Sequence, residues 1–264
     1  DLLDVKKSGE VSGSRFGYLK RELPLLEFAL VKMVFDMLTP KGFIPIIPPV
    51  LIKPEPYRRM GRLAGDQKDE RYYLEKDNLY LVGSSEHTIV PLHMVELFEE
   101  KDLPRRYVAF STCFRREAGA SGKDTKGILR VHQFDKVEMF VFTTPEQSEE
   151  EHQFLLAQQE EIMHKLGLPY RVVQNSTGDM GFTDAKQFDI EAWIPSEGRY
   201  RETHSCSNTT DFQARGVNCR YRTASNSKPE FVHMLNATGI TPRALIAILE
   251  NFQTKKGTVK VPKV

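Results

Sequence analysis

The sequence predicts an α+β fold in which an antiparallel β-sheet is flanked by helices, and three observations support this. Two runs with strand periodicity, 108–115 and 130–142, enclose a polar segment of turn composition, which is typical of a hairpin with a long loop. Apolar residues recur at helical spacing in 24–38 and 146–167. Several strand-like runs follow between 168 and 222, and they read as further strands of an antiparallel sheet.

Composition describes an ordinary globular chain. The 264 residues suffice for one large domain or two small ones, with 40% apolar and 28% charged residues. A net charge of +1 gives no electrostatic case for nucleic acid or an anionic membrane. No apolar run is long enough to cross a bilayer, and no secretory signal is visible, although the first residue is Asp rather than Met.

The cysteines carry no pairing pattern. Cys113, Cys206 and Cys219 are isolated, and no CxxC pair occurs. We therefore expect neither a structural zinc site nor a disulfide framework, and an intracellular, reducing compartment fits best. Cys206 is expected to be a small buried hydrophobe.

The N-terminal part begins with a polar segment, 1–23, followed by an amphipathic helix over 24–38. The run 41–53 contains Pro48 and Pro49 in succession, which excludes a helix and suits an extended edge strand. Residues 53–78 are charged and are expected to be a surface excursion.

Two later helices have clear boundaries. The helix 146–167 ends at Gly167, and its glutamate run, with His152 and His164, is expected to face solvent. Thr241 is a candidate N-cap, with Pro242 at the first helical position. Arg243 then lies in the first turn, and a helix N-terminus beside an arginine is suited to bind an anion.

The most informative stretch is Ser111–Glu138, within the predicted hairpin. Alternate residues of a strand share a face, so Arg115 should point with Glu117, and Phe134 with Glu138. Such a charged face is poor core material, because unpaired buried charges are costly. It suits a ligand that is anionic in one part, cationic in another and aromatic in a third.

This stretch carries a resemblance to a known family. The segment 113–138, CFRREAGASGKDTKGILRVHQFDKVE, resembles motif 2 of class II aminoacyl-tRNA synthetases in its seryl form. The helix–strand unit around 24–50 is similar to motif 1, and the segment around 235–253 is similar to motif 3. Motif 2 itself spans about 108–140. Together the three motifs imply that residues 1–264 form one catalytic domain.

The resemblance implies ATP-dependent activation of L-serine to seryl-adenylate with release of pyrophosphate, followed by transfer to tRNA(Ser). Arg115 would bridge the serine carboxylate and the α-phosphate. Phe134 and Arg243 would enclose the adenine, whose amino group would donate to Glu117. Arg130 would contact a terminal phosphate.

The same resemblance assigns the remaining site. Glu202, with Ser205, would hold Mg²⁺ between ATP phosphates, and Mg²⁺ favours such hard oxygen ligands. Glu138, counted as catalytic with Arg115 and Arg243, would bind the serine ammonium or the metal. Ser84 stands where a threonine is usual. The expected serine-binding set is Ser84, Glu86, Arg115, Glu138, Ser205, Asn236 and Thr238.

Each motif also has a plainer interpretation. The helix 24–38 could simply pack on its own core, and Ser84 or Ser85 could be a helix cap. His204 departs from the small residue often found there, and no role is assigned to it. The span from Asn236 to Arg243 looks about one residue shorter than the seryl pattern, which either tightens the loop or weakens the serine and ATP contacts.

The expected partners are serine, ATP and, in the full enzyme, tRNA(Ser). No sustained heptads are present, so the tRNA-binding coiled-coil arm is missing and weak tRNA binding is expected. Motif 1 implies a homodimer. No membrane partner and no zinc are expected, and the location should be cytoplasmic, with a mitochondrial one left open.

Two other functions stay open. One is a seryl-synthetase-like ligase that loads an amino acid onto a carrier protein, which bound zinc would favour. The other is an inactive synthetase-like binding or regulatory module, which a failure to bind ATP would favour.

Overall fold

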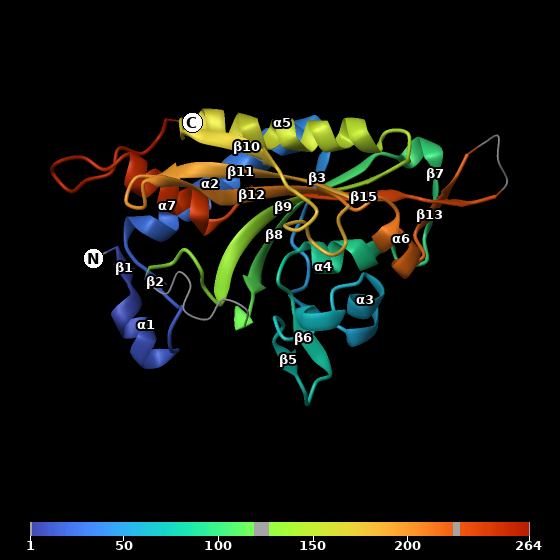
Figure 1. The fold of residues 1–264 in the computed structure, drawn as a ribbon, viewed down its shortest axis with the longest axis horizontal. Coiled ribbons are helices and arrows are strands. Elements are labelled where there is room, and N and C mark those ends of the chain that lie inside the picture. The colour runs from blue at the N-terminus through green and yellow to red at the C-terminus, as the bar shows by residue number, and fades with distance from the viewer. Residues whose placement is uncertain (1, 119–126, 224–227, 264) are drawn as a thin grey trace.

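The computed structural model describes residues 2–118, 127–223 and 228–263, and its centre is a seven-stranded sheet (Figure 1). The strand order is β10, β11, β12, β15, β9, β8, β3. All neighbours pair antiparallel except β3 and β8, which run parallel. The predicted α+β sheet is confirmed, and the edge strand in 41–53 lies at the sheet edge, although it pairs in parallel. The strands are β3 (Phe43–Ile46), β8 (Arg105–Phe114), β9 (Gln133–Thr143), β10 (Tyr170–Gln174), β11 (Lys186–Ile194), β12 (Arg199–Asn208) and β15 (His233–Ile240).

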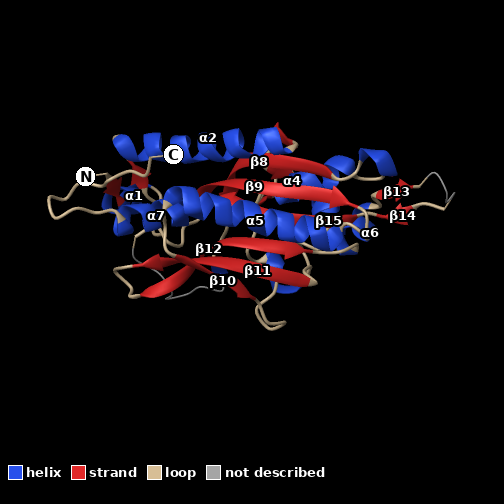
Figure 2. Ribbon diagram, turned by 90° about the horizontal axis from the view of Figure 1, so that it is seen from above, coloured by secondary structure: helices blue, strands red, loops and turns tan. Residues whose placement is uncertain are grey.

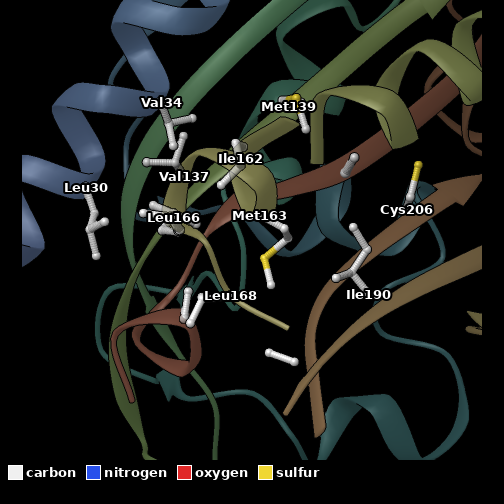
Figure 3. Packing of buried hydrophobic residues seen from close by; sticks show 14 of the residues in the cluster. Leu30, Val34, Val137, Met139, Ile162, Met163, Leu166, Leu168, Ile190 and Cys206 are labelled. Carbon is white, nitrogen blue, oxygen red and sulfur yellow. The ribbon is translucent and has the colours of Figure 1, made fainter. Parts of the chain in front are cut away.

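Three long helices cover one face of this sheet: α2 (Glu22–Leu38), α5 (Ser148–Leu166) and α7 (Pro242–Asn251). Seen from above, α5 runs over the middle of the sheet and α2 lies along the side of β8 (Figure 2). Their apolar side chains form the larger core with the sheet, as Leu30, Val34, Ile162 and Met163 show in Figure 3. Burying one such side chain stabilises the fold by about 1.5–3 kcal/mol.

Smaller elements lie under the other face. The helices there are α3 (Pro54–Arg59), α4 (Glu86–Ile89) and α6 (Phe212–Val217), joined by three short sheets and by α1 (Val5–Val11). The short strands are β1 (Leu3–Asp4), β2 (Tyr18–Leu19), β4 (Leu51–Ile52), β5 (Tyr73–Leu74), β6 (Leu79–Leu81), β7 (Leu97–Glu99), β13 (Arg220–Arg222) and β14 (Glu230–Phe231).

The stretch 53–78 differs from its prediction as a surface excursion. Tyr57 and Met60 are fully buried in a second apolar core beneath the sheet. Two apolar residues three positions apart place one side of α3 against that core, while its charged residues stay outside.

The central strand β9 separates two environments by its side-chain alternation. Val137 and Met139 belong to the core under α2, α5 and α7, whereas Phe140 belongs to the core on the opposite face. Phe134, Lys136, Glu138 and Phe140 alternate with the first set, so they share the second face. Phe134, Lys136 and Glu138 therefore share a face, as predicted, whereas Arg115 and Glu117 lie beyond the end of β8 and outside its alternation.

Helix α5 confirms the predicted segment and corrects its surface. It ends where Gly167 adopts a left-handed φ of 63°, which a glycine tolerates readily. His152, however, is fully buried, with Nε2 3.1 Å from the carbonyl oxygen of Cys206, and Glu151 is buried in an ion pair with Arg106. The predicted solvent-facing side is wrong at these positions, because a histidine and a glutamate with partners can be buried. Cys206 is buried as expected.

No helix within the described part of the chain is both long and apolar enough to cross a membrane.

Candidate active site

Two cavities, of about 240 and 520 Å³, lie on the face of the sheet opposite α5 and share one wall. The first is lined by Phe134, Glu202 and the start of α7, and the second by residues of α4 and by Arg62 and Arg71. The shared wall consists of Arg115, Glu117, Arg130, Lys136, Ser205 and Arg243. The two cavities are thus neighbouring parts of one polar cleft.

Arg115 stands at the junction of both cavities, directly after β8. Its Nε donates to the carbonyl oxygen of Gly83 at 3.1 Å, and its guanidinium carbon lies 5.2 Å from the centre of the Phe134 ring. Its backbone N–H also donates to the carbonyl oxygen of His132 at 3.0 Å. The guanidinium is therefore oriented by backbone and ring together, and an arginine so held can bind two oxygen atoms at once.

Glu117 and Arg130 face each other across the end of the hairpin. Arg130 Nη1 donates to a carboxylate oxygen of Glu117 at 2.7 Å. Glu117 adopts a positive φ of 53°, so the chain leaves strand geometry there. The loop predicted between the two strands is described only in part, since residues 119–126 lie outside the described residues.

Arg243 and Glu202 form the far wall of the first cavity. Arg243 Nη1 lies 3.0 Å from a carboxylate oxygen and 3.0 Å from the backbone carbonyl oxygen of Glu202. Burial alone would raise the pKa of Glu202, but the Arg243 guanidinium outweighs burial and leaves this pKa below its ordinary value. The pair thus offers one cation and one ionised carboxylate at the N-terminus of α7.

Thr241 occupies the predicted N-cap position of α7 without a side-chain capping bond. Its hydroxyl instead donates to the carbonyl oxygen of Thr203 at 3.4 Å, which ties the start of α7 to β12. Pro242 is the first residue of the helix, as the sequence predicted.

Lys136 and Glu138 form a buried ion pair on β9. Lys136 lines both cavities, while Glu138 lines neither and is 1% exposed beneath the lysine. Burial raises the pKa of Glu138, and Lys136 offsets this only in part. Glu138 was expected to contact substrate directly; in this structure Lys136 lies between it and the cleft. The sequence placed Lys136 on the same face as Phe134 and Glu138, but no role in the site was predicted for it.

Glu86 is held on the floor of the second cavity by two partners from distant segments. One oxygen of Glu86 accepts from Arg62 Nη2 and from Gln213 Nε2, each at 2.6 Å. Burial alone would raise the pKa of Glu86, but Arg62 outweighs it and leaves the pKa below its ordinary value. Ser84 lies beside it, with its Oγ 3.4 Å from the Glu86 backbone nitrogen. The two residues predicted together therefore lie together.

Several residues of the second cavity were not predicted. Arg62 and Arg71 come from the stretch 53–78, which was predicted to lie at the surface. Only the apolar residues Tyr57 and Met60, which bury one side of α3, indicated that part of this stretch packs inward. His87 is buried behind them, with Nδ1 2.8 Å from the Tyr57 hydroxyl and 3.0 Å from the Gly83 backbone nitrogen. Burial and the surrounding cations hold the pKa of His87 well below its ordinary value, so it is neutral.

The remaining predicted residues line the wall formed by β12 and β15. Ser205 borders both cavities, Thr238 the first and Asn236 the second. The Asn236 side-chain nitrogen is buried and has no hydrogen-bond partner among the described residues. Because a buried donor without a partner costs free energy, it points to a ligand that accepts from it.

The donors present suit a magnesium ion better than zinc. Among residues 2–118, 127–223 and 228–263, no group of three or more His, Cys, Asp or Glu side chains could hold a metal by itself. Glu202 supplies one ionised carboxylate with Ser205 on the same wall of the first cavity. Mg²⁺ commonly takes one or two carboxylates and completes its shell with phosphate oxygens and water, so this sparse set fits it.

The sequence matches one protein-family model and a series of known proteins. A family model described as the tRNA synthetase class II core domain (G, H, P, S and T) matches residues 71–252. A serine–tRNA ligase of Thermococcus onnurineus is 51% identical over 263 residues, which cover 99% of this chain and 57% of that protein. One of Pyrococcus furiosus is 49% identical, with 98% and 57% covered. The chain thus spans less than two thirds of the length of these relatives.

Solved structures of related enzymes have a similar fold. Seryl-tRNA synthetase from Pyrococcus horikoshii, complexed with ATP, superposes with a TM-score of 0.93 at 46% identity, covering 98% of this chain and 58% of that one. The cytoplasmic serine–tRNA ligase of Naegleria fowleri, in complex with AMP, also gives 0.93, at 40% identity, covering 99% and 62%. A prolyl-tRNA synthetase of Giardia lamblia, at 18% identity and a TM-score of 0.86, shares the fold.

Proposed function

This chain belongs to the class II tRNA synthetase core domain family (G, H, P, S and T), and we propose that it activates L-serine with ATP. The observation that carries the proposal is the place of Arg115, between a cavity with an aromatic ring and one with a buried carboxylate. A guanidinium in that place can bind the carboxylate of one ligand and a phosphate of another. The resemblance of 113–138 to the seryl form of motif 2 selects serine.

ATP would lie in the first cavity. The Phe134 ring offers a stacking surface for adenine, and Arg243 would close over the base from the other side. Glu117 would accept from the adenine amino group. Arg130 and Arg243 are cations at the shared wall, where a terminal phosphate would lie.

Serine would lie in the second cavity. Its carboxylate would bind Arg115, and its ammonium group would lie near the Glu86 carboxylate, which lines this cavity. Asn236 supplies a donor, and Ser84 and Ser205 supply hydroxyl groups. Thr238 adds a hydroxyl group from the first cavity, on the wall that Ser205 shares with the second. A site that bonds a substrate hydroxyl discriminates by about 10⁴–10⁵ against the analogue that lacks it, so alanine would be rejected.

The reaction needs position and charge rather than a side-chain nucleophile. The serine carboxylate oxygen attacks the α-phosphorus, the bond from that phosphorus to the bridging oxygen breaks, and pyrophosphate leaves with both electrons. Arg115 would hold attacking group and α-phosphate together, which converts a two-body encounter into a step within one complex. Its charge also stabilises the negative charge that develops on the phosphoryl oxygens.

A magnesium ion fits the same arrangement. Glu202 would hold it with Ser205 nearby, and when bound it would neutralise phosphate charge. Arg243 pairs with Glu202 in this structure, so the arginine would have to share or exchange this carboxylate when ATP and the metal arrive.

The partners of the complete protein follow from the same proposal. Serine would pass to tRNA(Ser) after activation. A homodimer through α2 and the end of β3 is supported by exposed apolar residues, since Leu25 and Phe28 of α2 and Ile47, directly after β3, are 67%, 61% and 77% exposed. The three cysteines are free and buried, which supports a reducing compartment such as the cytoplasm.

Amino-acid-dependent exchange between ATP and pyrophosphate tests the proposal directly. Across the standard amino acids, only serine should support fast exchange. Arg115→Ala should reduce it by about 100-fold or more, as loss of a preorganised charge at a reacting centre does. Arg171→Ala, which removes an exposed arginine paired with Glu191, is the matched control and should exchange normally. Equal exchange with several amino acids, or none with serine, would reject the proposal.

A further inference from the structure

The strands β12 and β15 are paired along only part of their length. Their register runs through Asn208–Leu235 and Ser207–Asn236 to Cys206–Ala237. Beyond Cys206, within the described residues, β12 continues to Glu202 and β15 to Ile240 without further ladder pairs between them. The residues of this unpaired part include Glu202, Ser205 and Thr238, which line the first cavity.

Helix α5 bridges the strands where the ladder stops. The side-chain nitrogen of Gln159 donates to the carbonyl oxygen of Ser205 at 2.8 Å and to that of Thr238 at 2.9 Å. Gln159 is fully buried on the face opposite the cleft, and its Oε1 has no hydrogen-bond partner among the described residues. Burying a glutamine with one unsatisfied polar atom costs free energy, so the need to fill space does not explain its presence. Its two donor contacts explain why a glutamine is present.

A histidine makes the next bridge. His204 Nε2 lies 3.2 Å from the carbonyl oxygen of Gly239, and Nδ1 lies 2.8 Å from the Thr203 hydroxyl. The Gly239 oxygen can only accept, so Nε2 carries the hydrogen and Nδ1 is an acceptor. The one hydrogen of the Thr203 hydroxyl is shared between Nδ1 and the carbonyl oxygen of Ile190, which lies 3.2 Å away. His204 is 1% exposed, and burial lowers its pKa to about 4, so this neutral form is the one present.

Both strands carry an extra residue at this point. The register of β11 with β12 shifts between Ile190 and Glu191, which leaves Thr203 without a paired residue on β11. The register of β15 with β9 shifts between Thr238 and Ile240, which leaves out Gly239. A Cβ on Gly239 would lie 3.0 Å from Val34 Cγ1 and 3.3 Å from the carbonyl oxygen of Val137, so a side chain there would crowd both neighbours.

We propose that Gln159 and His204 are positioning residues that fix the separation of β12 and β15 at the wall that carries Ser205 and Thr238. In a continued ladder, opposed Cα atoms would lie about 4.5–5.5 Å apart, and backbone groups would satisfy one another. Here the Gln159 amide and the His204 imidazole bond the backbone oxygens instead. They set the distance between Ser205 and Thr238, and so the position of Ser205, which borders both cavities. This inference rests on the proposed function, because it assigns these two residues to serine activation.

The first test replaces Gln159 by methionine, which has a similar shape and removes both donors. Serine-dependent exchange should then show a KM for serine raised by about tenfold, as the loss of two neutral hydrogen bonds predicts. The matched control is Gln158→Met. Gln158 is buried on the same helix, but the hydrogen bonds it makes within the described residues go to Phe154 and Lys41 and not to either strand, so the KM of this variant for serine should stay normal.

His204 provides a second and independent test. His204→Gln keeps a nitrogen donor near the position of Nε2 and should retain a KM for serine close to that of the unmodified protein. His204→Met removes the donor and should raise this KM several-fold. This pair keeps the inference testable if Gln159→Met does not fold, and the rescue by glutamine would not be expected of a residue that only fills space.

The outcomes separate the two proposals. A normal KM for serine in both methionine variants, with an active unmodified protein, overturns the positioning role alone. A loss of exchange activity in proportion to the fraction of folded protein, with kcat reduced and the KM for serine unchanged, overturns the positioning role as well. No serine-dependent exchange in the unmodified protein rejects the proposed function, and this inference with it.

Discussion

Arg115 and Gly83 are joined by a hydrogen bond of 3.1 Å, from Nε of the arginine to the glycine carbonyl oxygen. This bond couples the end of β8 to the loop before α4. A Cβ on Gly83 would meet Arg71 Nη1 at 3.0 Å and the carbonyl oxygen of Phe114 at 3.4 Å. A side chain at this position would therefore press on the Arg71 guanidinium in the loop that orients Arg115.

Gly83→Ala should accordingly reduce serine-dependent exchange and lower the free energy of unfolding by about 1–3 kcal/mol, the usual cost of overpacking. Exchange kinetics and urea unfolding would measure the two effects. Gly9→Ala is the control: a Cβ there meets nothing within 4 Å, and Gly9 lies in helix α1. That variant should be about as stable as the original or slightly more so.

Arg62 should be essential for stability because it neutralises Glu86, whose side chain is 5% exposed. Arg62→Met should lower the free energy of unfolding by about 3–5 kcal/mol, since it leaves a buried carboxylate unpaired. Adding Glu86→Gln should recover part of the loss. A double-mutant cycle by denaturant unfolding measures the coupling, and additive effects would argue against a direct pair.

Phe134 should act on ATP rather than on serine, because it lines the first cavity and not the second. Phe134→Ala should raise the KM for ATP by about tenfold or more, as the loss of a base–ring stack of about 1–3 kcal/mol implies. The KM for serine should change little. Phe134→Tyr keeps the ring and should behave almost normally.

Buried neutral histidines should make the protein sensitive to mild acid. The pKa values of His87, His152 and His204 are all lowered by burial, that of His204 to about 4. The unfolded chain then binds more protons, so stability is full above the ordinary histidine pKa of about 6.5 and falls as the pH drops below it. Each histidine contributes up to about 1.4 kcal/mol per pH unit in that range. Unfolding measured between pH 7.5 and 5 should be less pH-dependent in His204→Gln.

The exposed apolar side of α2 should mediate self-association. Leu25→Glu together with Phe28→Glu should shift the protein from dimer to monomer in analytical ultracentrifugation, because charges there would be buried without partners. Val11→Glu, at a residue that is 64% exposed on α1, should leave the mass unchanged. A monomeric unmodified protein at micromolar concentration would contradict the assignment.

The sequence predicted those parts of the fold that local patterns determine. The hairpin of β8 and β9 and the helices α2 and α5 follow from periodicity and from boundary residues such as Gly167. The residues around Arg115 were predicted together because they lie on two neighbouring strands. Their chemical roles remain predictions.

Other parts of the site depend on partners distant in the chain. Glu86 meets Gln213 across 127 positions, and Gln159 meets Thr238 across 79. His152 was placed at the surface because a helix rich in glutamate gives no sign that one of its sides is covered by a sheet. Such pairings arise only from the packing of whole elements, and no local pattern contains them.

The alternation along β9 limits how this protein can change in length. An insertion or deletion of one residue inside the strand would exchange the two faces, turning Lys136 and Glu138 toward α2 and α5 and Val137 toward the cleft. One event would destroy the core and the site at once. Natural and engineered variation in length should therefore be confined to segments outside this strand, such as the connection between Phe114 and Gln133.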